Sequence, residues 1–242
     1  MEKEGGGTAF LAHREEGLTL TDGKLEIRGD FTRMLPRLRQ GNLERELLVK
    51  ASGIKKGRRD LPSEESENVT GKDRLPRAVD ASAGLGEDSI LLAAAGFYVT
   101  MYEKDPVIAA LLKDALLRAQ TIPALSGIVE NMELIEGDSI PALRELSFRP
   151  DVVLLDPMFP ERQKSAAVKK KFQLLHQLEE PCRDEEEFMR AALFSGPQRL
   201  IVKRPAKGPF LAGKRPDYSL SGKAVRFDCY INIANIAKES QK

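Results

Sequence analysis

Two short segments of the chain carry residue types that could do chemistry together. Residues 80–88 read Asp-Ala-Ser-Ala-Gly-Leu-Gly-Glu-Asp, and residues 156–160 read Asp-Pro-Met-Phe-Pro. Each segment follows an apolar run that is typical of a buried strand. The glycines of the first segment suit a tight backbone turn against a nucleotide-type cofactor. The acid, proline and aromatic residue of the second suit a reaction on a planar amino group.

The first segment resembles the cofactor turn of class I methyltransferases, which use S-adenosylmethionine. Gly84 and Gly86 follow a predicted strand that ends at Asp80. Ligands of open α/β sheets bind at the carboxyl ends of the strands, so polar residues after the next two strands belong to the same predicted site. In this fold Glu103 is expected to contact the ribose hydroxyls of the cofactor, and Asp138 and Ser139 its adenine amino group.

Two other interpretations of the turn stay open. The glycines could serve packing only, in an ordinary connection between a strand and a helix. The turn could also belong to an enzyme that binds a nicotinamide dinucleotide, but the third glycine of the Gly-x-Gly-x-x-Gly pattern is missing.

The second segment begins with Asp156, directly after the apolar residues 152–155. It resembles the Asp/Asn-Pro-Pro-Tyr/Phe motif of enzymes that methylate exocyclic or amide nitrogen. An aromatic amine is a poor nucleophile because its lone pair is delocalised into the ring. The Asp156 carboxylate and the Pro157 carbonyl would accept hydrogen bonds from the amine, while Phe159 would stack on the base and orient it. The alternative is a tight turn in which Asp156 caps a helix and Phe159 lies in the core.

Further segments extend the resemblance beyond the two turns: residues 163–166, 202–205 and 226–230. Together they resemble the bacterial small-subunit ribosomal RNA guanine-N2 methyltransferase family, known as methyltransferase J, over roughly residues 24–233. The resemblance implies that a guanine of 16S rRNA is the substrate and that S-adenosylmethionine is converted to S-adenosylhomocysteine. It implies cofactor contacts at Glu87, Asp88, Glu103, Lys104, Asp138, Ser139 and Asp156.

The chain departs from the Asp/Asn-Pro-Pro-Tyr/Phe motif in one place and from the methyltransferase J family in two. Met158 replaces the usual second proline of the motif, which weakens assignment to the enzymes that methylate adenine or glutamine. The polar insert near residues 55–76 is longer than the family leads us to expect, and the N-terminal portion matches poorly. The insert and the N-terminal portion bear on RNA docking rather than on the methyl-transfer core.

Basic residues near the predicted site are candidates for contacts with RNA phosphates. Lys203 and Arg204 could instead pair with acids, and residues 226–228 (Arg-Phe-Asp) could be a structural ion pair beside a core phenylalanine. A guanine in structured RNA would have to be unstacked or already exposed before its N2 could react. The predicted RNA-binding residues are Lys164, Lys169, Lys170, Lys203 and Arg204.

The predicted elements are those of a class I methyltransferase, an α/β fold with a mostly parallel, Rossmann-like, seven-stranded sheet. A C-terminal antiparallel hairpin follows from the turn at Gly222. Residues 1–76 are predicted to be an N-terminal extension with a poorly packed lead-in, a short strand, a helix and a polar loop, and residues 77–242 the catalytic domain. The expected strands are 24–28, 78–81, 98–103, 133–136, 152–155, 199–203, 217–221 and 225–233, and the expected helices 42–51, 88–95, 106–119, 140–146, 166–178 and 184–194.

The composition excludes several other classes of protein. The 242 residues are 41% hydrophobic and 31% charged, with a formal net charge of +1, as in a soluble globular protein. No apolar run is long enough to span a membrane, and the N-terminus lacks the apolar stretch of a signal peptide. With two cysteines and two histidines, the sequence predicts neither a disulfide framework nor a structural metal site, so we expect no metal and a reduced, cytoplasmic location.

These observations predict an enzyme that methylates the N2 amine of a guanine in 16S rRNA of the small ribosomal subunit. Within enzymes, the alternatives are methylation of adenine N6 or of a protein glutamine. Outside enzymes, the alternative is an RNA-binding ribosome-assembly factor without turnover. The sequence does not determine which nucleotide is methylated or whether naked RNA or the assembled subunit is preferred. It also does not determine the role of the insert or the oligomeric state.

Overall fold

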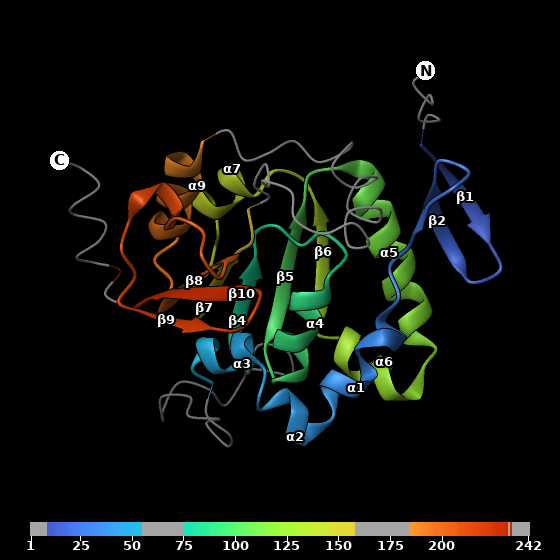
Figure 1. Ribbon diagram of the computed structural model, residues 1–242, viewed down its shortest axis with the longest axis horizontal. Helices are drawn as coiled ribbons and strands as arrows, with labels where there is room; N and C mark the ends of the chain where they lie inside the picture. Colours follow the sequence, from blue (N-terminus) through green and yellow to red (C-terminus); the bar gives the residue numbers. More distant parts are fainter. Residues whose placement is uncertain (1–8, 55–74, 158–183, 232, 234–242) are drawn as a thin grey trace.

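A computed structural model describes residues 9–54, 75–157, 184–231 and 233 (Figure 1). The predicted helix at 166–178, the larger part of the polar insert, and residues Phe159, Lys164, Lys169 and Lys170 lie outside these ranges. Within the described residues, no helix has the length and apolar character needed to cross a membrane.

The molecule is built around a seven-stranded sheet with the order β6-β5-β4-β7-β8-β10-β9. The first five strands of this order run parallel, and β10 pairs antiparallel with both β8 and β9. The predicted parallel sheet with a C-terminal antiparallel hairpin is therefore confirmed. The strands are β4 (Arg77–Asp80), β5 (Tyr98–Glu103), β6 (Met132–Glu136), β7 (Val152–Leu155), β8 (Arg199–Pro205), β9 (Tyr218–Ser221) and β10 (Val225–Tyr230).

Helices cover both faces of this sheet, which explains why its central strands are apolar on both sides. In β7, Val152 and Leu154 face one core and Val153 and Leu155 the other, and all four are buried. The first core lies under α3, α4, α5 and α6, and the second under α7 and α9. These helices are α3 (Leu47–Ser52), α4 (Glu87–Ala94), α5 (Pro106–Gln120), α6 (Pro123–Val129), α7 (Ser139–Arg144) and α9 (Glu185–Phe194).

The N-terminal residues differ from the sequence prediction. Instead of a poorly packed lead-in, they form β1 (Phe10–Arg14) and β2 (Gly17–Thr21), which join β3 (Glu26–Ile27) in a separate antiparallel sheet. The alternating Gly-Leu-Thr-Leu-Thr of β2 buries Leu20 against Ile27 and Leu111 of α5. This alternation is short, so it is a weak signal beside the charged residues that flank it. The predicted short strand at 24–28 is confirmed by β3.

The segment after the small sheet is a run of short helices rather than one predicted helix over 42–51. It comprises η1 (Phe31–Met34), α1 (Leu35–Leu38), α2 (Gln40–Leu43) and α3. The backbone is extended at Glu46, where ψ is 131°, and this separates α2 from α3. In that position the Glu46 carboxylate accepts two hydrogen bonds from the Arg37 guanidinium, each 2.8 Å long. This ion pair offsets the loss of helical hydrogen bonds at the break.

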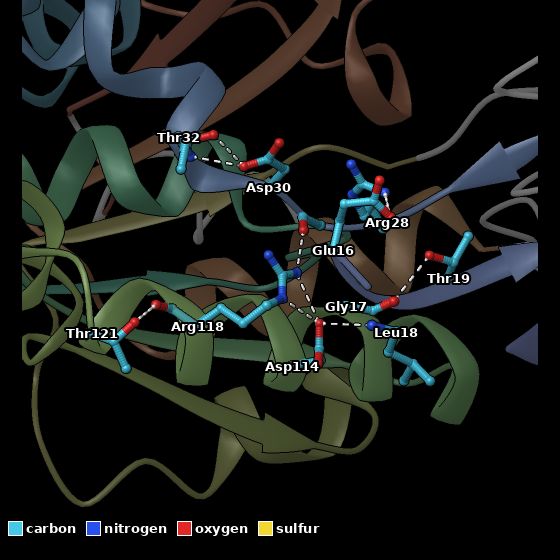
Figure 2. Close-up of polar contacts among 11 residues, drawn as sticks. Glu16, Gly17, Leu18, Thr19, Arg28, Asp30, Thr32, Asp114, Arg118 and Thr121 are labelled. Atoms are coloured by element: carbon cyan, nitrogen blue, oxygen red, sulfur yellow. Dashed lines mark hydrogen bonds and ion pairs between the residues drawn. The ribbon is translucent and has the colours of Figure 1, made fainter. Parts of the chain in front are cut away.

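The small sheet is attached to α5 by a polar group at the middle of that helix (Figure 2). Asp114 Oδ2 accepts from the Leu18 N–H at 3.1 Å and from Arg118 Nε at 2.8 Å. Arg118 Nη2 also donates to the Gly29 carbonyl oxygen at 2.6 Å. Gly17 has a φ of +125°, and a side chain there would collide with Arg118. The hairpin is therefore fixed in place by directed hydrogen bonds as well as by the apolar contacts of β2.

Substitution Asp114→Ala should loosen the small sheet while leaving the seven-stranded sheet intact. It removes the acceptor for Leu18 and the partner of Arg118, at a cost of about 1 to 3 kcal/mol in the free energy of unfolding. Amide hydrogen exchange should accelerate at Leu18 and Leu20 and stay slow in β4 and β7. Lys113→Ala, at the exposed neighbouring position, is the control. Unchanged exchange in β2 of the Asp114 variant would contradict this role.

Candidate active site

The carboxyl edge of the parallel strands gathers most of the predicted site residues. Because β5, β4, β7 and β8 are neighbours in the sheet, the residues at their ends lie in one row. In that order these residues are Glu103, Asp80, Asp156 and Lys203, with Asp138 beyond them after β6. The edge therefore places four carboxylates and one ammonium group along one side of the turn at 81–86.

The glycines of this turn meet two different requirements. Both have positive φ, +53° at Gly84 and +76° at Gly86, which a glycine adopts without strain. A Cβ on Gly86 would lie only 2.8 Å from Leu112 Cδ1 and 3.1 Å from Phe31 Cζ, so this glycine also allows close packing. A Cβ on Gly84 would meet nothing within 4 Å. The turn is thus packed tightly behind Gly86 and open to a ligand at Gly84.

Glu103 ties the turn to the end of β5. Its Oε2 accepts from the Gly84 N–H and its Oε1 from the Asp105 N–H, both at 2.9 Å. The side chain is buried, and burial raises the pKa of the Glu103 carboxyl, against the opposing effect of these backbone donors. Each carboxylate oxygen has two lone pairs, so these bonds leave capacity to accept from ribose hydroxyls.

Asp80 supports the turn from beneath and is only 2% exposed. Its Oδ2 accepts from the Ser89 hydroxyl at 2.5 Å, and its Oδ1 accepts from the Ser82 N–H at 3.2 Å. Burial raises the pKa of Asp80 to about 7, with further increases from the charges of Asp88 and Asp156. Asp80 is accordingly a buried carboxyl that holds the turn in shape.

Asp156 is fixed through both its backbone and its side chain. Its N–H donates to Ser82 Oγ at 2.7 Å, which joins the acid–proline turn to the cofactor turn. Its Oδ2 accepts from Lys203 Nζ at 2.8 Å, and the same ammonium donates to Asp88 Oδ2 at 2.5 Å. Burial raises the pKa of Asp156, and the Lys203 charge opposes that rise. Burial alone would lower the pKa of Lys203, but the two carboxylates raise it above its ordinary value.

The remaining residues predicted to bind the cofactor lie on the same edge of the sheet, and they differ in how far they are exposed to solvent. Asp138 is exposed and caps α7, accepting from the Ile140 N–H at 2.8 Å, while Ser139 beside it is buried. Glu87, in the first turn of α4, and Lys104, after β5, are both exposed. Pro157 is buried directly after Asp156. No group of three or more metal-ligating side chains is found in the ranges that the structure covers.

Two residues predicted to contact RNA, Lys203 and Arg204, are bonded to other groups of the protein. Lys203 is paired with Asp88 and Asp156, as in the alternative that the sequence left open. Arg204 is 1% exposed, and its Nε donates to the Pro209 carbonyl at 2.8 Å. An arginine buried in this way presents no guanidinium to a phosphate. Residues 226–228 likewise match the structural alternative, because Arg226 pairs with Asp228 at 2.7 Å and Phe227 is buried.

Two serines contribute to the site although the sequence prediction did not select them. Ser82 links Asp80 to the Asp156 backbone, and Ser89 supplies the hydroxyl to Asp80. The sequence does contain a signal for these serines. A carboxylate at the end of a buried strand requires nearby hydrogen-bond donors, and both serines lie within nine residues of Asp80. Hydroxyl residues are common in such turns, so their type alone did not distinguish them.

The carboxyl edge of the sheet fits S-adenosylmethionine, because it offers hydrogen-bond acceptors and open space beside the turn. The turn at Gly84 leaves room for close approach to the backbone, and Glu103 and Asp138 provide acceptors after β5 and β6. A cofactor with a charged methionine portion, a ribose and an adenine needs acceptors spread over successive strand ends. The described residues supply that arrangement.

Comparisons with known proteins agree with this assignment. Residues 65–232 match a protein family described as "Putative SAM-dependent methyltransferase". The Ribosomal RNA small subunit methyltransferase J of Alkalilimnicola ehrlichii is 39% identical, over 93% of this chain and 83% of that protein. The protein of the same name from Thioalkalivibrio sulfidiphilus is 40% identical, over 88% and 79%. The crystal structure of the SAM-dependent methyltransferase NGO1261 from Neisseria gonorrhoeae has a TM-score of 0.69 at 29% identity, over 96% of this chain and 86% of that one.

The raised pKa of Asp80 predicts a specific dependence of stability on pH. The folded state keeps the Asp80 proton up to a pH of about 7, whereas the unfolded chain loses it near its ordinary pKa of about 4. Folding therefore binds a proton, so the contribution of Asp80 to stability is lost as pH rises from about 4 to 7 and is constant above that range.

Asp80→Asn removes this titration while keeping a side chain of the same shape. As pH rises from about 4 to 8, the wild type should lose about 4 kcal/mol of unfolding free energy relative to the variant. Urea unfolding of both proteins across this pH range measures the difference directly. Parallel curves for the two proteins would show that Asp80 is ionised in the folded state at low pH.

Proposed function

Because this chain belongs to the small-subunit methyltransferase J family of S-adenosylmethionine-dependent methyltransferases, we propose that it methylates the exocyclic N2 amine of a guanine in 16S rRNA. The observation that carries the proposal is the position of Asp156, one hydrogen bond from the cofactor turn through Ser82. That position brings an acceptor for an amino group beside the binding site for a methyl donor. The name of the relatives supports ribosomal RNA of the small subunit as the substrate.

The roles of the cofactor residues follow from their places on the sheet edge. The backbone at Gly84 and Gly86 would hold the methionine portion, and Glu103 the ribose hydroxyls. When bound, S-adenosylmethionine supplies an electrophilic methyl group, which the guanine N2 takes as the carbon–sulfur bond breaks and its electron pair stays on sulfur, leaving S-adenosylhomocysteine. The other proposed contacts are those of Asp80, Glu87, Asp88, Lys104, Asp138, Ser139 and Asp156.

Asp156 and Pro157 would act on the amine. The Asp156 carboxylate and the Pro157 carbonyl would accept hydrogen bonds from the two N2–H groups, which favours localisation of the nitrogen lone pair toward the methyl group. One of these protons leaves the product amine, and Asp156 or water can take it. Phe159, the predicted stacking partner, lies outside the described residues.

RNA recognition is proposed for the basic residues that follow the acid–proline turn. These are Lys164, Lys169 and Lys170, all outside the described residues, and they would contact phosphates. Lys203 and Arg204 have partners within the protein, so their positions do not support a phosphate contact. An N2 amine is reached only when the guanine is unstacked or exposed. A ribosomal substrate would place the enzyme in the cytoplasm.

The proposed division of the chain into a catalytic domain and an N-terminal extension follows from the positions of the site residues. We assign the chemistry to residues 77–242, since the strand ends that form the site all belong to that range. Residues 1–76 would be an extension that packs on this unit. The match to the methyltransferase family over residues 65–232 supports the division.

A transfer assay with nucleoside analysis tests the proposed function. Small subunits from cells lacking this gene are incubated with the protein and methyl-labelled S-adenosylmethionine, then digested and separated. We expect label in N2-methylguanosine. Asp156→Ala should lower the transfer rate at least about 100-fold and change cofactor affinity by less than about tenfold, because an oriented acceptor is lost.

Other outcomes of this assay would point to the alternatives. Label in N6-methyladenosine or in a glutamine side chain would keep the fold and cofactor but contradict the guanine assignment. Cofactor binding without any labelled product would favour an assembly factor without turnover. Normal transfer by the Asp156→Ala protein would remove Asp156 from the mechanism.

A second variant tests whether Ser82 positions Asp156. Ser82→Ala deletes the acceptor for the Asp156 N–H, which should let the acid–proline turn shift and slow transfer about 10- to 100-fold. Ser82→Thr keeps the hydroxyl and should retain most of the activity. Single-turnover rates at saturating cofactor separate this effect from cofactor binding. Equal rates for the Ala and Thr variants would show that the hydrogen bond has no part in the reaction.

A further inference from the structure

One cation lies between the two carboxylates that flank the proposed reaction site. Lys203 Nζ is 2.5 Å from Asp88 Oδ2 and 2.8 Å from Asp156 Oδ2. We call these three side chains the Asp88–Lys203–Asp156 bridge. It joins the first turn of α4, the residue that follows β7 and the carboxyl-terminal half of β8. One of its carboxylates is therefore on the cofactor side of the site and the other on the acceptor side.

Strand register explains why Lys203 reaches this position. Leu155 is paired with Val202 in the parallel β7–β8 ladder, so Asp156 and Lys203 are the next residues of the two strands. Side chains alternate between the faces of a strand, and Leu155 and Val202 face the core under α7 and α9. Asp156 and Lys203 consequently turn toward the other face, where Asp88 lies in the first turn of α4. The bridge is a consequence of the fold rather than of chance rotamers on a surface.

The bridge is also shielded enough for its charges to matter. The side-chain exposed fractions are 24% for Lys203, 17% for Asp88 and 35% for Asp156. Charges that are partly withdrawn from water interact more strongly than fully exposed pairs. The charged or titratable groups that interact with Asp156 are Lys203 and Arg204 from β8, Asp88 from α4 and Asp80 from β4.

Lys203 is the cation that directly contacts Asp156 in this group. Asp88 is an acid close to Asp156, and its negative charge disfavours ionisation of Asp156. With Asp80 the effect runs the other way, because the charge of Asp156 raises the pKa of Asp80. Arg204 is buried on the other side of β8 and bonds to Pro209 and Glu185 instead. A carboxylate that must accept hydrogen bonds from an amine has to be ionised, because the protonated form gives up part of its acceptor capacity.

We propose that Lys203 is a positioning residue for methyl transfer, which keeps the Asp156 carboxylate ionised and oriented toward the amine while Asp88 holds the ammonium in place. This inference rests on the proposed function of Asp156. It assigns Lys203 a role inside the protein in place of the RNA contact expected from the sequence. Lys203 touches no reacting atom, so its effect should appear in the rate and pH dependence of transfer and not in RNA affinity.

The test compares the pH dependence of single-turnover methyl transfer for the wild type and two oppositely acting variants. The acid limb of the wild-type profile reports ionisation of Asp156, since the rate rises as the carboxyl loses its proton. Lys203→Met removes the favourable cation, so the midpoint of that limb should move up by about 1 to 3 pH units. At neutral pH the rate should fall at least about tenfold. Asp88→Asn removes a neighbouring negative charge, so the midpoint should move down.

Matched variants separate this role from a structural one. Lys203→Arg keeps the positive charge and should restore a midpoint near that of the wild type. Lys203→Gln is a second neutral variant of similar length, to be measured should Lys203→Met fail to fold. Lys207→Met removes an exposed lysine from the segment that follows β8 and should leave the profile unchanged. Binding of S-adenosylmethionine and of subunits is measured for every protein.

The outcomes distinguish this inference from the proposed function. Opposite shifts in the Lys203→Met and Asp88→Asn profiles, with RNA affinity unchanged, would support it. A wild-type profile in the neutral Lys203 variants, or a loss confined to RNA affinity, would overturn it while N2-methylguanosine production still stands. Absence of product from the wild type would instead contradict the proposed function.

Discussion

The site depends on one buried carboxyl, that of Asp80 at the end of β4. It accepts from the backbone of Ser82 and the hydroxyl of Ser89, and so fixes both the turn and the start of α4. Ser82 in turn receives the Asp156 N–H, so the position of the acceptor carboxylate is set by a hydrogen-bond chain that begins at Asp80. Burying a carboxyl is unfavourable unless its acceptors are satisfied or it takes up a proton. Here both happen, because its oxygens are bonded and its pKa is raised to about 7.

Polar residues in this edge are divided between support and chemistry. Asp80, Ser82 and Ser89 contact other protein groups, whereas Gly84 and Asp138 face space that a ligand can occupy. Glu103 belongs to both sets, because its two oxygens already hold the backbone of the turn and can still accept from hydroxyl groups. The acceptors proposed for the cofactor are thus oriented in advance, which would lower the entropy that binding has to offset.

The seven-stranded sheet could be predicted from the sequence because its strands are apolar runs that end in polar turns. Residues 152–155 are an example, since four consecutive apolar residues before Asp156 are typical of a strand buried on both faces. The hairpin at β1 and β2 escaped prediction because its alternation is brief and because it packs on α5, where Asp114 is 96 residues from its hydrogen-bond partner Leu18. The partners of Lys203 were also hidden, because they follow from the register of β7 against β8 and from the position of α4, neither of which is local. Side-chain contacts between neighbouring strands can be assigned only when the fold is known.

The position of α3 bears on how the chain acquires its structure. This helix, complete by residue 52, packs against α4 and also against β8, β9 and β10, and a Cβ on Gly222 in the final hairpin would lie 3.0 Å from Leu47 Cδ1. Part of its packing surface therefore gains its partners only after nearly the whole polypeptide has been synthesised. Contacts of such long sequence separation slow folding, because loop-closure entropy is lost before they form. During translation, α4 is available to this helix early, whereas its contacts with β8, β9 and β10 form only after the last strands have been synthesised.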